Sequence, residues 1–411
     1  MTAESRDRVL RLGIATAYAL IVVWLGAASL GLPKLSGASS DLTLDWLVVR
    51  AVVNGQSPYQ PIEDLAEQYE IVLGDIGVPE LGNAVRVHPR TPGALLLLLP
   101  LLLVSPNTLH MLSLILNTAA AVAFLLSIAA ATSIRADWLL LAAPLLILSH
   151  PAISAFEFGS QSFVVAALVT IAVGLMRRTD SIPGGVSLGL AITLKLWPAL
   201  LVVLLLGRGH RRSAAAAVAT SGALAALASV VFRLSPRQVW DGMTTASSTW
   251  IGFSGNGSLA GRFVLMGMPV RVATALSVLL LVAILPWIWD RRVNLDVALW
   301  GTIAVAVLAS PLSWDHYDVV LIPIAIVLAR HSSRWSDPTR WVLLAWAALT
   351  LGGRFVLLVI DQQSAISGAL AFSERAMILV ALLGVVRRLV REAEAVQPPP
   401  LSVPNEEKLT A

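Results

Sequence analysis

The sequence predicts an all-α membrane protein that crosses the bilayer many times. Of its 411 residues, 57% are hydrophobic and 13% are charged, whereas soluble domains carry about 25% charged residues. About a dozen apolar runs approach the roughly 17–25 residues that a helix needs to span the hydrocarbon core. These runs are continuous rather than alternating, which excludes a transmembrane β-barrel.

The charged residues indicate topology rather than nucleic-acid binding. The net charge is +4, but arginine and lysine occur in short clusters between apolar runs instead of on one face. Positive clusters favour the cytoplasmic side, so we expect a multi-pass plasma-membrane protein with both termini in the cytoplasm. The chain has no cysteine, which excludes disulfides and cysteine-based zinc or redox sites.

The first apolar run, Ile14 to Leu30, follows three arginines and ends in small residues. That pattern also fits a cleavable signal peptide, but the many later spans favour an uncleaved anchor. Counting inward from both ends places five stretches outside the cytoplasm: 32–87, 155–161, 233–269, 312–316 and 354–371. We expect one transmembrane domain over residues 1–390 and a disordered cytoplasmic tail over 391–411, which is rich in proline and charge.

The first outer loop, residues 31–107, contains an expected interfacial helix. Ser40 can cap its start, and Gly55 with Pro58 can end it. Asp41 and Asp45, at i and i+4, share one face of this helix. On the helix alone, these carboxylates are most simply a solvated acidic edge.

Two apolar stretches are irregular. Residues Thr91 to Val104 are too short to span and contain Pro100, which is typical of a re-entrant or interfacial segment. Residues Gly184 to Gly207 contain Lys195 and Pro198, which predicts a broken hairpin with Lys195 at its tip. About two dozen residues cannot cross a full bilayer twice at 1.5 Å per residue.

Polar residues at the predicted outer side form a candidate site. Each has an ordinary alternative, such as a snorkelling lysine, an interfacial histidine or a solvated edge, but ionisable groups at membrane depth usually mark a cavity. The candidates are Asp41, Asp45, His88, Gln161, Lys195, Asn256, Arg262, Asp315 and His316.

The residue types point to base-assisted transfer from a phosphorylated donor. A carboxylate and a histidine can accept a proton, and cations can stabilise a departing phosphate. Outside the cytoplasm a lipid phosphate is the natural carrier of the transferred group. No Walker loop, dinucleotide fingerprint, zincin motif or serine elbow competes with this interpretation. We expect neither a metal nor a cofactor.

Several motifs resemble those of glycosyltransferase family 87. Asp41, Arg50, Gly55, Pro58 and Tyr59 keep the spacing of the family's D-F-x-x-Y, A-R-A, G and P-Y elements. "LKLWP" is similar to L-K-P-x-P, "NGSL" to N-Q-S-L, and "SPLSWDHYD" to S-P-x-S-W-D-H-H. Asp45 stands where an aromatic residue is usual, and His88, Arg90 and Tyr317 also depart from the family pattern.

The resemblance implies a GT-C fold with about 12 transmembrane helices, and an inverting transfer of mannose from a polyprenyl-phosphate donor to a glycolipid or lipoglycan at the outer membrane face. The alternatives are an arabinofuranosyltransferase of the same family and a lipid-linked sugar transporter or flippase. Asp41 would be the base, assisted by His316, with Lys195, Arg262 and Arg90 near the donor phosphate. The expected sugar or acceptor contacts are Tyr59, Asp45, His88, Gln161, Asn256 and Asp315.

Overall fold

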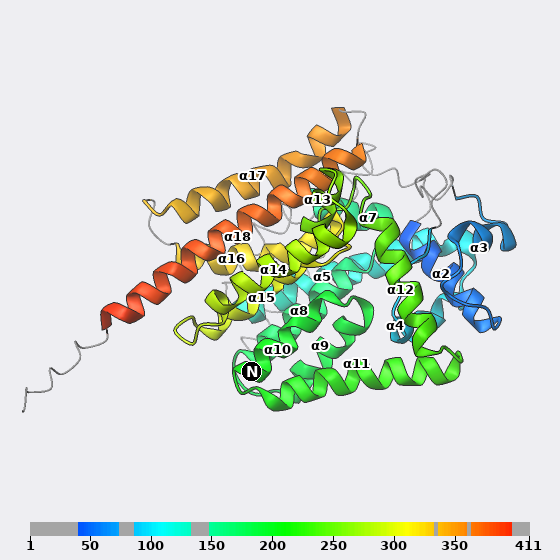
Figure 1. Cartoon of the computed structure of the whole chain (residues 1–411), viewed down its shortest axis with the longest axis horizontal. Coiled ribbons are helices and arrows are strands. Elements are labelled where there is room, and N and C mark those ends of the chain that lie inside the picture. Colours follow the sequence, from blue (N-terminus) through cyan, green and yellow to red (C-terminus); the bar gives the residue numbers. More distant parts are fainter. Residues whose placement is uncertain (1–39, 74–85, 133–147, 333–335, 360–362, 397–411) are drawn as a thin grey trace, which may run out of the picture.

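A computed structural model describes residues 40–73, 86–132, 148–332, 336–359 and 363–396 (Figure 1). Within these residues the regular secondary structure is helical, and an isolated bridge pairs Asn256 with Trp314. The predicted all-α class is therefore confirmed. The first apolar run, Ile14 to Leu30, lies outside the described residues, so its role as an anchor stays a prediction.

The helices before Lys195 include both short loop helices and longer apolar ones. They are α2 (Ser40–Val53), α3 (Ile62–Gln68), α4 (Pro92–Leu98), the 3₁₀ turns η1 (Leu99–Leu103) and η2 (Pro106–Thr108), α5 (Leu109–Thr132), α7 (His150–Phe158), α8 (Ser162–Met176) and α9 (Ile182–Leu194).

The part of the chain after Lys195 contains the longest described helix, α18. Its elements are η3 (Trp197–Ala199), α10 (Leu200–Gly207), α11 (Arg211–Val231), α12 (Pro236–Trp250), α13 (Leu259–Leu265), α14 (Val270–Trp289), α15 (Leu295–Ala309), η4 (Asp315–Val320), α16 (Leu321–His331), α17 (Pro338–Val359) and α18 (Gln363–Val396).

Four helical segments in the described part of the chain are long and apolar enough to cross a membrane: 106–132, 211–231, 270–289 and 366–395. Five further apolar helices are shorter than a bilayer crossing requires. The chain is therefore a membrane protein, as its composition predicts. These four segments do not establish the expected count of about 12 spans.

The interfacial helix predicted in the first outer loop is α2. It begins at Ser40 and ends at Val53, and Gly55 follows with a φ of +78°, in the left-handed region that favours glycine. Leu47, Val48 and Val49 are buried. The helix is thus held by a core of its own, formed with α3, α4 and Trp250 of α12, rather than resting as a solvated edge.

Both irregular apolar stretches break where the sequence predicts. Helix α4 starts after Thr91, whose hydroxyl accepts from Ala94 N, and changes to the 3₁₀ turn η1 next to Pro100. Helix α9 ends at Leu194, and Lys195 has extended backbone angles before η3 and α10. At 1.5 Å per residue, α9 and α10 are about 20 and 12 Å long, so neither crosses about 30 Å of hydrocarbon.

Helices α9 and α11 make a very close contact (Figure 1). A Cβ added at Gly185 would lie 2.2 Å from the carbonyl oxygen of Ser213, and one at Gly189 would lie 2.6 Å from Thr220 Cβ. Small residues allow such approach between helices in membranes, where dispersion forces depend on contact. These two glycines therefore set the spacing between the helices.

Replacing Gly185 with alanine is expected to destabilise the protein by about 1–3 kcal/mol, because the new methyl group forces the backbones of α9 and α11 apart. The matched control is Gly222→Ala on α11, where an added Cβ meets nothing within 4 Å. The temperature at which half of the purified protein still elutes as a single species measures the effect. Equal midpoints for the two variants would show that the contact tolerates the methyl group.

The predicted outer segments contact one another. Trp250 Nε1 donates to Val87 O at 2.9 Å, Ser367 Oγ donates to Asp315 Oδ2 at 2.7 Å, and Asn256 bridges to Trp314. The structure therefore brings four of the five predicted outer stretches together, and the fifth joins them through Gln161, as described below.

The last described helix extends into residues 391–396, which the sequence analysis assigns to a disordered tail. Helix α18 continues past Arg391 to Val396 because alanine and glutamate, both good helix formers, fill this stretch. Figure 1 shows α18 lying along α17. Residues 397–411 lie outside the described part of the chain.

Candidate active site

Helix α2 presents its two aspartates differently. Asp45 is completely buried, whereas the Asp41 side chain, one turn earlier, is 23% exposed. Both residues lie in α2 at i and i+4, so they share one face of the helix as predicted. Only Asp41 is open to a ligand.

Asp45 is the centre of a buried polar cluster. Arg90 donates to it through both Nε and Nη2, the latter at 2.9 Å from Oδ2. His88 Nε2 lies 2.8 Å from Oδ1, and Gln161 Nε2 donates to Oδ2 at 2.7 Å. We call these four residues, Asp45, His88, Arg90 and Gln161, the Asp45 cluster.

The cluster fixes the charge of its members. Burial alone would raise the pKa of Asp45, but Arg90 and His88 together hold that pKa below its ordinary value. Burial and the nearby Arg90 lower the pKa of His88, so a neutral His88 donates to an ionised Asp45. Asp45 and Arg90 form a buried, bidentate ion pair.

The segment that carries His88 and Arg90 is anchored on both sides. Trp250 Nε1 donates to Val87 O at 2.9 Å, and Tyr59 donates through its hydroxyl to Arg90 O at 3.0 Å. The Tyr59 ring packs so closely against Gly242 that a Cβ there would lie 2.2 Å from it. Tyr59 thus holds the backbone of Arg90 in place.

Asp41 lies near His316, next to the Asp45 cluster. The distance from Asp41 Oδ2 to His316 Nε2 is 3.8 Å, which is longer than a hydrogen bond. His316 is 3% exposed and packs between the rings of Phe158 and Tyr317. Residues 275 positions apart in the chain therefore present a carboxylate and an imidazole to the same place.

Asp315 is surrounded by polar groups of three elements. Its Oδ2 accepts from Ser154 Oγ and Ser367 Oγ, each at 2.7 Å, and lies 3.0 Å from His150 Nε2. Its Oδ1 accepts from the backbone N–H of His316 at 2.7 Å. Both carboxylate oxygens thus have protein partners.

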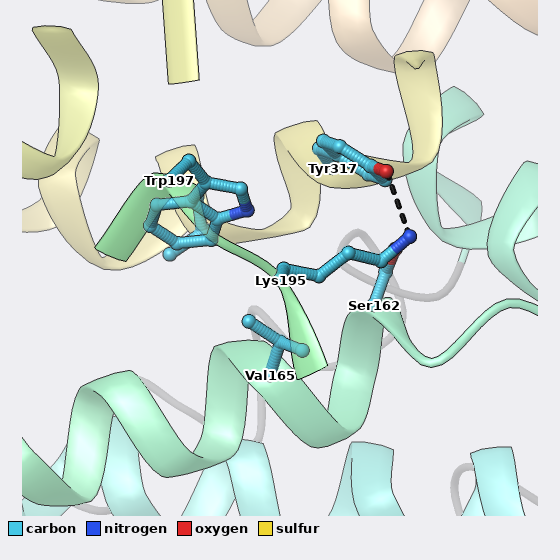
Figure 2. Close-up of a pocket in the computed structure, with 6 residues that line it drawn as sticks. Ser162, Val165, Lys195, Trp197 and Tyr317 are labelled. Carbon is cyan, nitrogen blue, oxygen red and sulfur yellow. Dashed lines mark hydrogen bonds between the residues drawn. The ribbon is translucent and has the colours of Figure 1, made fainter. Parts of the chain in front are cut away.

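Lys195 reaches into a small pocket between α8 and η4 (Figure 2). Its ammonium group donates to the Tyr317 hydroxyl at 2.7 Å. Ser162, Val165, Trp197 and Val320 complete the lining. We call this hollow the Lys195 pocket; it combines one cation and two hydroxyl groups with an apolar wall. Because Tyr317 directly follows His316, the pocket adjoins the Asp41–His316 pair.

Asn256 and Arg262 lie in a buried loop and bond to backbone atoms. Asn256 Nδ2 donates to Pro311 O at 2.8 Å, while its Oδ1 accepts from Ser258 N and Ser313 N. Arg262 donates to the carbonyl oxygens of Ser254 and Asn256. Asn256 therefore joins the 254–262 segment to the 311–314 loop, whereas Arg262 bonds within its own segment.

Two buried polar side chains that contact η4, His150 and Arg375, were not predicted. His150, at the start of α7, contacts Asp315, and Arg375 of α18 donates to Asp318 at 2.6 Å and to the carbonyl oxygens of Ser313 and Trp314. A signal existed for Arg375, since an arginine within an apolar run is expensive in a membrane. His150 had no such signal, because it directly precedes a proline at the edge of an apolar stretch.

Comparison with known proteins gives a consistent result. A model of glycosyltransferase family 87 matches residues 91–311, more than half of the chain. A polyprenol-phosphate-mannose-dependent alpha-(1-2)-phosphatidylinositol mannoside mannosyltransferase of Mycolicibacterium smegmatis is 32% identical over 246 residues, which are 53% of this chain and 54% of that protein. The protein of the same name from Mycobacterium tuberculosis is 31% identical over 208 residues, 47% of this chain and 48% of its own length.

The chain thus spans about half the length of the relatives that it matches. The family match includes Lys195 and the Asn256 loop, whereas Asp41, Asp315 and His316 lie outside it.

Proposed function

Because the chain belongs to glycosyltransferase family 87, we propose that it transfers a mannosyl residue from a polyprenyl-phosphate donor to a glycolipid or lipoglycan acceptor. The observation that carries this proposal is the partly exposed Asp41 carboxylate, which lies 3.8 Å from His316 and near the Lys195 pocket. The names of the two mycobacterial relatives support the donor and suggest a phosphatidylinositol mannoside as the acceptor.

Asp41 serves as the base in the proposed reaction. An acceptor hydroxyl loses its proton to Asp41 while its oxygen bonds to the anomeric carbon of the sugar, and the bond from that carbon to the phosphate oxygen breaks. The configuration at that carbon inverts, because one nucleophile displaces the leaving group directly. The lipid phosphate leaves with the electron pair and needs no protonation, unlike the alcohol released by a glycosidase.

Asp45 is a poor candidate for the same role. Both of its oxygens accept from Arg90, and His88 and Gln161 donate to it as well. A base must reach the proton that it removes, and Asp45 is completely buried. The Asp45 cluster instead holds α2 so that Asp41, one turn earlier, faces His316.

The Lys195 pocket suits the leaving group. An ammonium and a phenol hydroxyl, 2.7 Å apart, can both donate to phosphate oxygens as charge develops on them. The Val165, Trp197 and Val320 side chains beside them offer apolar surface to the first part of an isoprenoid chain. Arg90 and Arg262 were the other cations expected at the phosphate. Arg90 is paired with Asp45, and Arg262 donates to backbone carbonyl oxygens, so Lys195 is the better candidate.

The architecture belongs to the proposal as well. We place the contacting outer segments, with Asp41 and His316, at the outer face of the plasma membrane and both termini in the cytoplasm, in a GT-C fold with about 12 spans. The contacts that join Val87 to Trp250, Asn256 to Trp314 and Ser367 to Asp315 support a single outer end. The donor is a substrate, and no cofactor takes part.

Transfer by purified protein in lipid nanodiscs tests the proposal. The protein is incubated with radiolabelled polyprenyl-phosphate mannose and phosphatidylinositol mannosides, and the expected result is a labelled lipid with one added mannose. Polyprenyl-phosphate arabinofuranose in a parallel reaction tests the other donor. Transfer of arabinofuranose alone, or of neither sugar by folded protein, would contradict the proposal.

Replacing Lys195 with methionine is expected to raise KM for the donor about 10-fold or more, because a hydrogen bond to a charged group is worth about 1.5–3 kcal/mol. KM for the acceptor should change little, since the pocket lies on the leaving-group side. Tyr317→Phe removes one hydroxyl donor and should raise the donor KM by a smaller factor. Unchanged donor KM values in both variants would place the phosphate elsewhere.

A further inference from the structure

The contacts of Asp315 link the proposed catalytic pair to a histidine that the reaction itself does not use. His150 Nε2 lies 3.0 Å from Asp315 Oδ2, on the opposite side of the carboxylate from His316. Asp315 Oδ1 accepts from His316 N at 2.7 Å and lies 3.4 Å from His316 Nδ1. The chain of groups therefore runs from His150 through Asp315 and His316 to Asp41.

Three separate elements hold the Asp315 carboxylate. Helix α7 contributes His150 and Ser154, helix α18 contributes Ser367, and η4 contributes the His316 backbone N–H. Burial alone would raise the pKa of Asp315, but contacts with His150 and His316 hold that pKa well below its ordinary value. An ionised carboxylate only accepts hydrogen bonds, so Asp315 favours the tautomers of His150 and His316 that direct an N–H towards it, and its nitrogen distances of 3.0 and 3.4 Å are shorter than the 3.8 Å between Asp41 and His316.

We propose that His150 is a positioning residue that acts through Asp315 to fix the tautomer and the orientation of His316. This inference rests on the proposed function, because it concerns the histidine that faces the base. His150 and the two serine hydroxyls occupy Oδ2 of Asp315, so Oδ1 is directed to His316. His316 then carries its hydrogen on Nδ1 and presents the lone pair of Nε2 to Asp41.

In this arrangement His316 can accept a proton from Asp41. The proton that Asp41 takes from the acceptor hydroxyl can move to Nε2 of His316, and the resulting imidazolium is stabilised by the Asp315 carboxylate. The same division of roles operates in catalytic triads, where a buried aspartate sets the tautomer of a histidine. The 3.4 and 3.8 Å separations are longer than hydrogen bonds, as is common before a substrate tightens a site.

The competing interpretation of Asp315 is the sugar contact expected from the sequence. A sugar-binding carboxylate offers a free oxygen to hydroxyl groups, whereas both oxygens of Asp315 have protein partners and the residue is 5% exposed. The two interpretations differ in kinetics. Loss of a sugar contact raises KM, whereas loss of positioning lowers kcat with little change in KM.

Two variants of His150 separate the positioning role from packing. His150→Phe keeps a ring of similar size and removes the nitrogen that lies 3.0 Å from Asp315, while His150→Gln keeps an amide N–H near the position of Nε2. We expect kcat for mannose transfer to fall about 10- to 100-fold in His150→Phe, a part of what general base catalysis contributes. We expect the two KM values to stay within about 2-fold and His150→Gln to recover most of kcat.

His110→Phe on α5 is the matched control, since it replaces a histidine outside the site, and it should leave kcat unchanged. Size-exclusion profiles of all variants check folding. A folded His150→Phe with normal kcat, or with a raised KM and normal kcat, would overturn the positioning role.

Nitrogen-15 NMR of histidine-labelled protein in nanodiscs gives a readout that does not depend on transfer. The signals of His316 are those that disappear in His316→Gln. We expect the Nδ1–H tautomer in the wild type and in His150→Gln, and loss of that preference in His150→Phe. Hydrogen on Nε2 in the wild type would refute the inference even if no variant folds, and it would do so whether or not the wild type transfers mannose.

Discussion

Asp41→Asn is expected to lower the rate of mannose transfer by about 10²- to 10⁴-fold, the range that a general base contributes. The amide has nearly the shape of the carboxylate but cannot accept the acceptor proton. Because Asp41 is partly exposed and its contact with His316 is 3.8 Å, the variant should fold and bind both substrates normally. Initial rates with labelled donor, at saturating acceptor, measure the effect.

The matched control for this prediction is Asp64→Asn. Asp64 is an exposed carboxylate on α3, in the same outer loop, and its replacement should leave the rate unchanged. Full activity in folded Asp41→Asn would move the role of base to another residue, and the proposed geometry of attack would then be wrong.

Asp45→Leu is expected to produce the largest loss of stability, about 3–5 kcal/mol, because it leaves the Arg90 guanidinium charged and buried without its partner. Arg90 is 3% exposed and donates to Asp45 through two nitrogens. His88 and Gln161 lose their acceptor in the same variant. The midpoint of thermal unfolding in detergent, followed by loss of the monodisperse species, measures the effect.

The double variant Asp45→Leu with Arg90→Met is the control for charge. Replacing a whole buried ion pair by apolar residues is often neutral or stabilising, so the double variant should be more stable than Asp45→Leu alone. Recovery should be partial, because His88 and Gln161 remain without an acceptor. A double variant as unstable as the single one would show that packing around Asp45, and not the unpaired charge, determines the loss.

Local features of the fold were predictable from the sequence. The start of α2 at Ser40, its end before Gly55, and the break at Lys195 depend on caps, a left-handed glycine and prolines near one another in the chain. Family membership was also predictable, from motifs spread along the chain. The count of about 12 spans stays a prediction, because the lengths of short apolar helices such as α9 and α10 do not show whether they contribute to a crossing.

The contacts among the site residues required the structure. Asp45, His88 and Arg90 each departed from the resembled family pattern, and they prove to contact one another. Tyr317, a fourth departure, contacts Lys195. These departures are therefore connected in the structure, where the Asp45 carboxylate in α2 contacts His88 and Arg90 in the segment before α4. Helices that are apolar on all sides carry no periodic signal to reveal such pairing.

The same reason explains why His150 and Arg375 were missed. Their partners, Asp315 and Asp318, lie on η4, far away in the sequence. Only the packing of α7 and α18 against η4 brings them together. Motif spacing identified Asp315 and His316 as candidate residues, but it gave no information about which side chains of other helices contact them.

The break between helices α9 and α10 at Lys195 affects how a lipid-linked substrate would enter the site. An isoprenoid anchor confines its headgroup to the lipid leaflet, so the search for the enzyme takes place in two dimensions. Helices α9 and α10 are each shorter than the hydrocarbon core is thick. A lipid-anchored phosphate could therefore reach the Lys195 ammonium by lateral diffusion within its leaflet, without entering water. On that view, the hydrophobic tail stays solvated by lipid throughout turnover, and release of the spent carrier needs no passage through the aqueous phase.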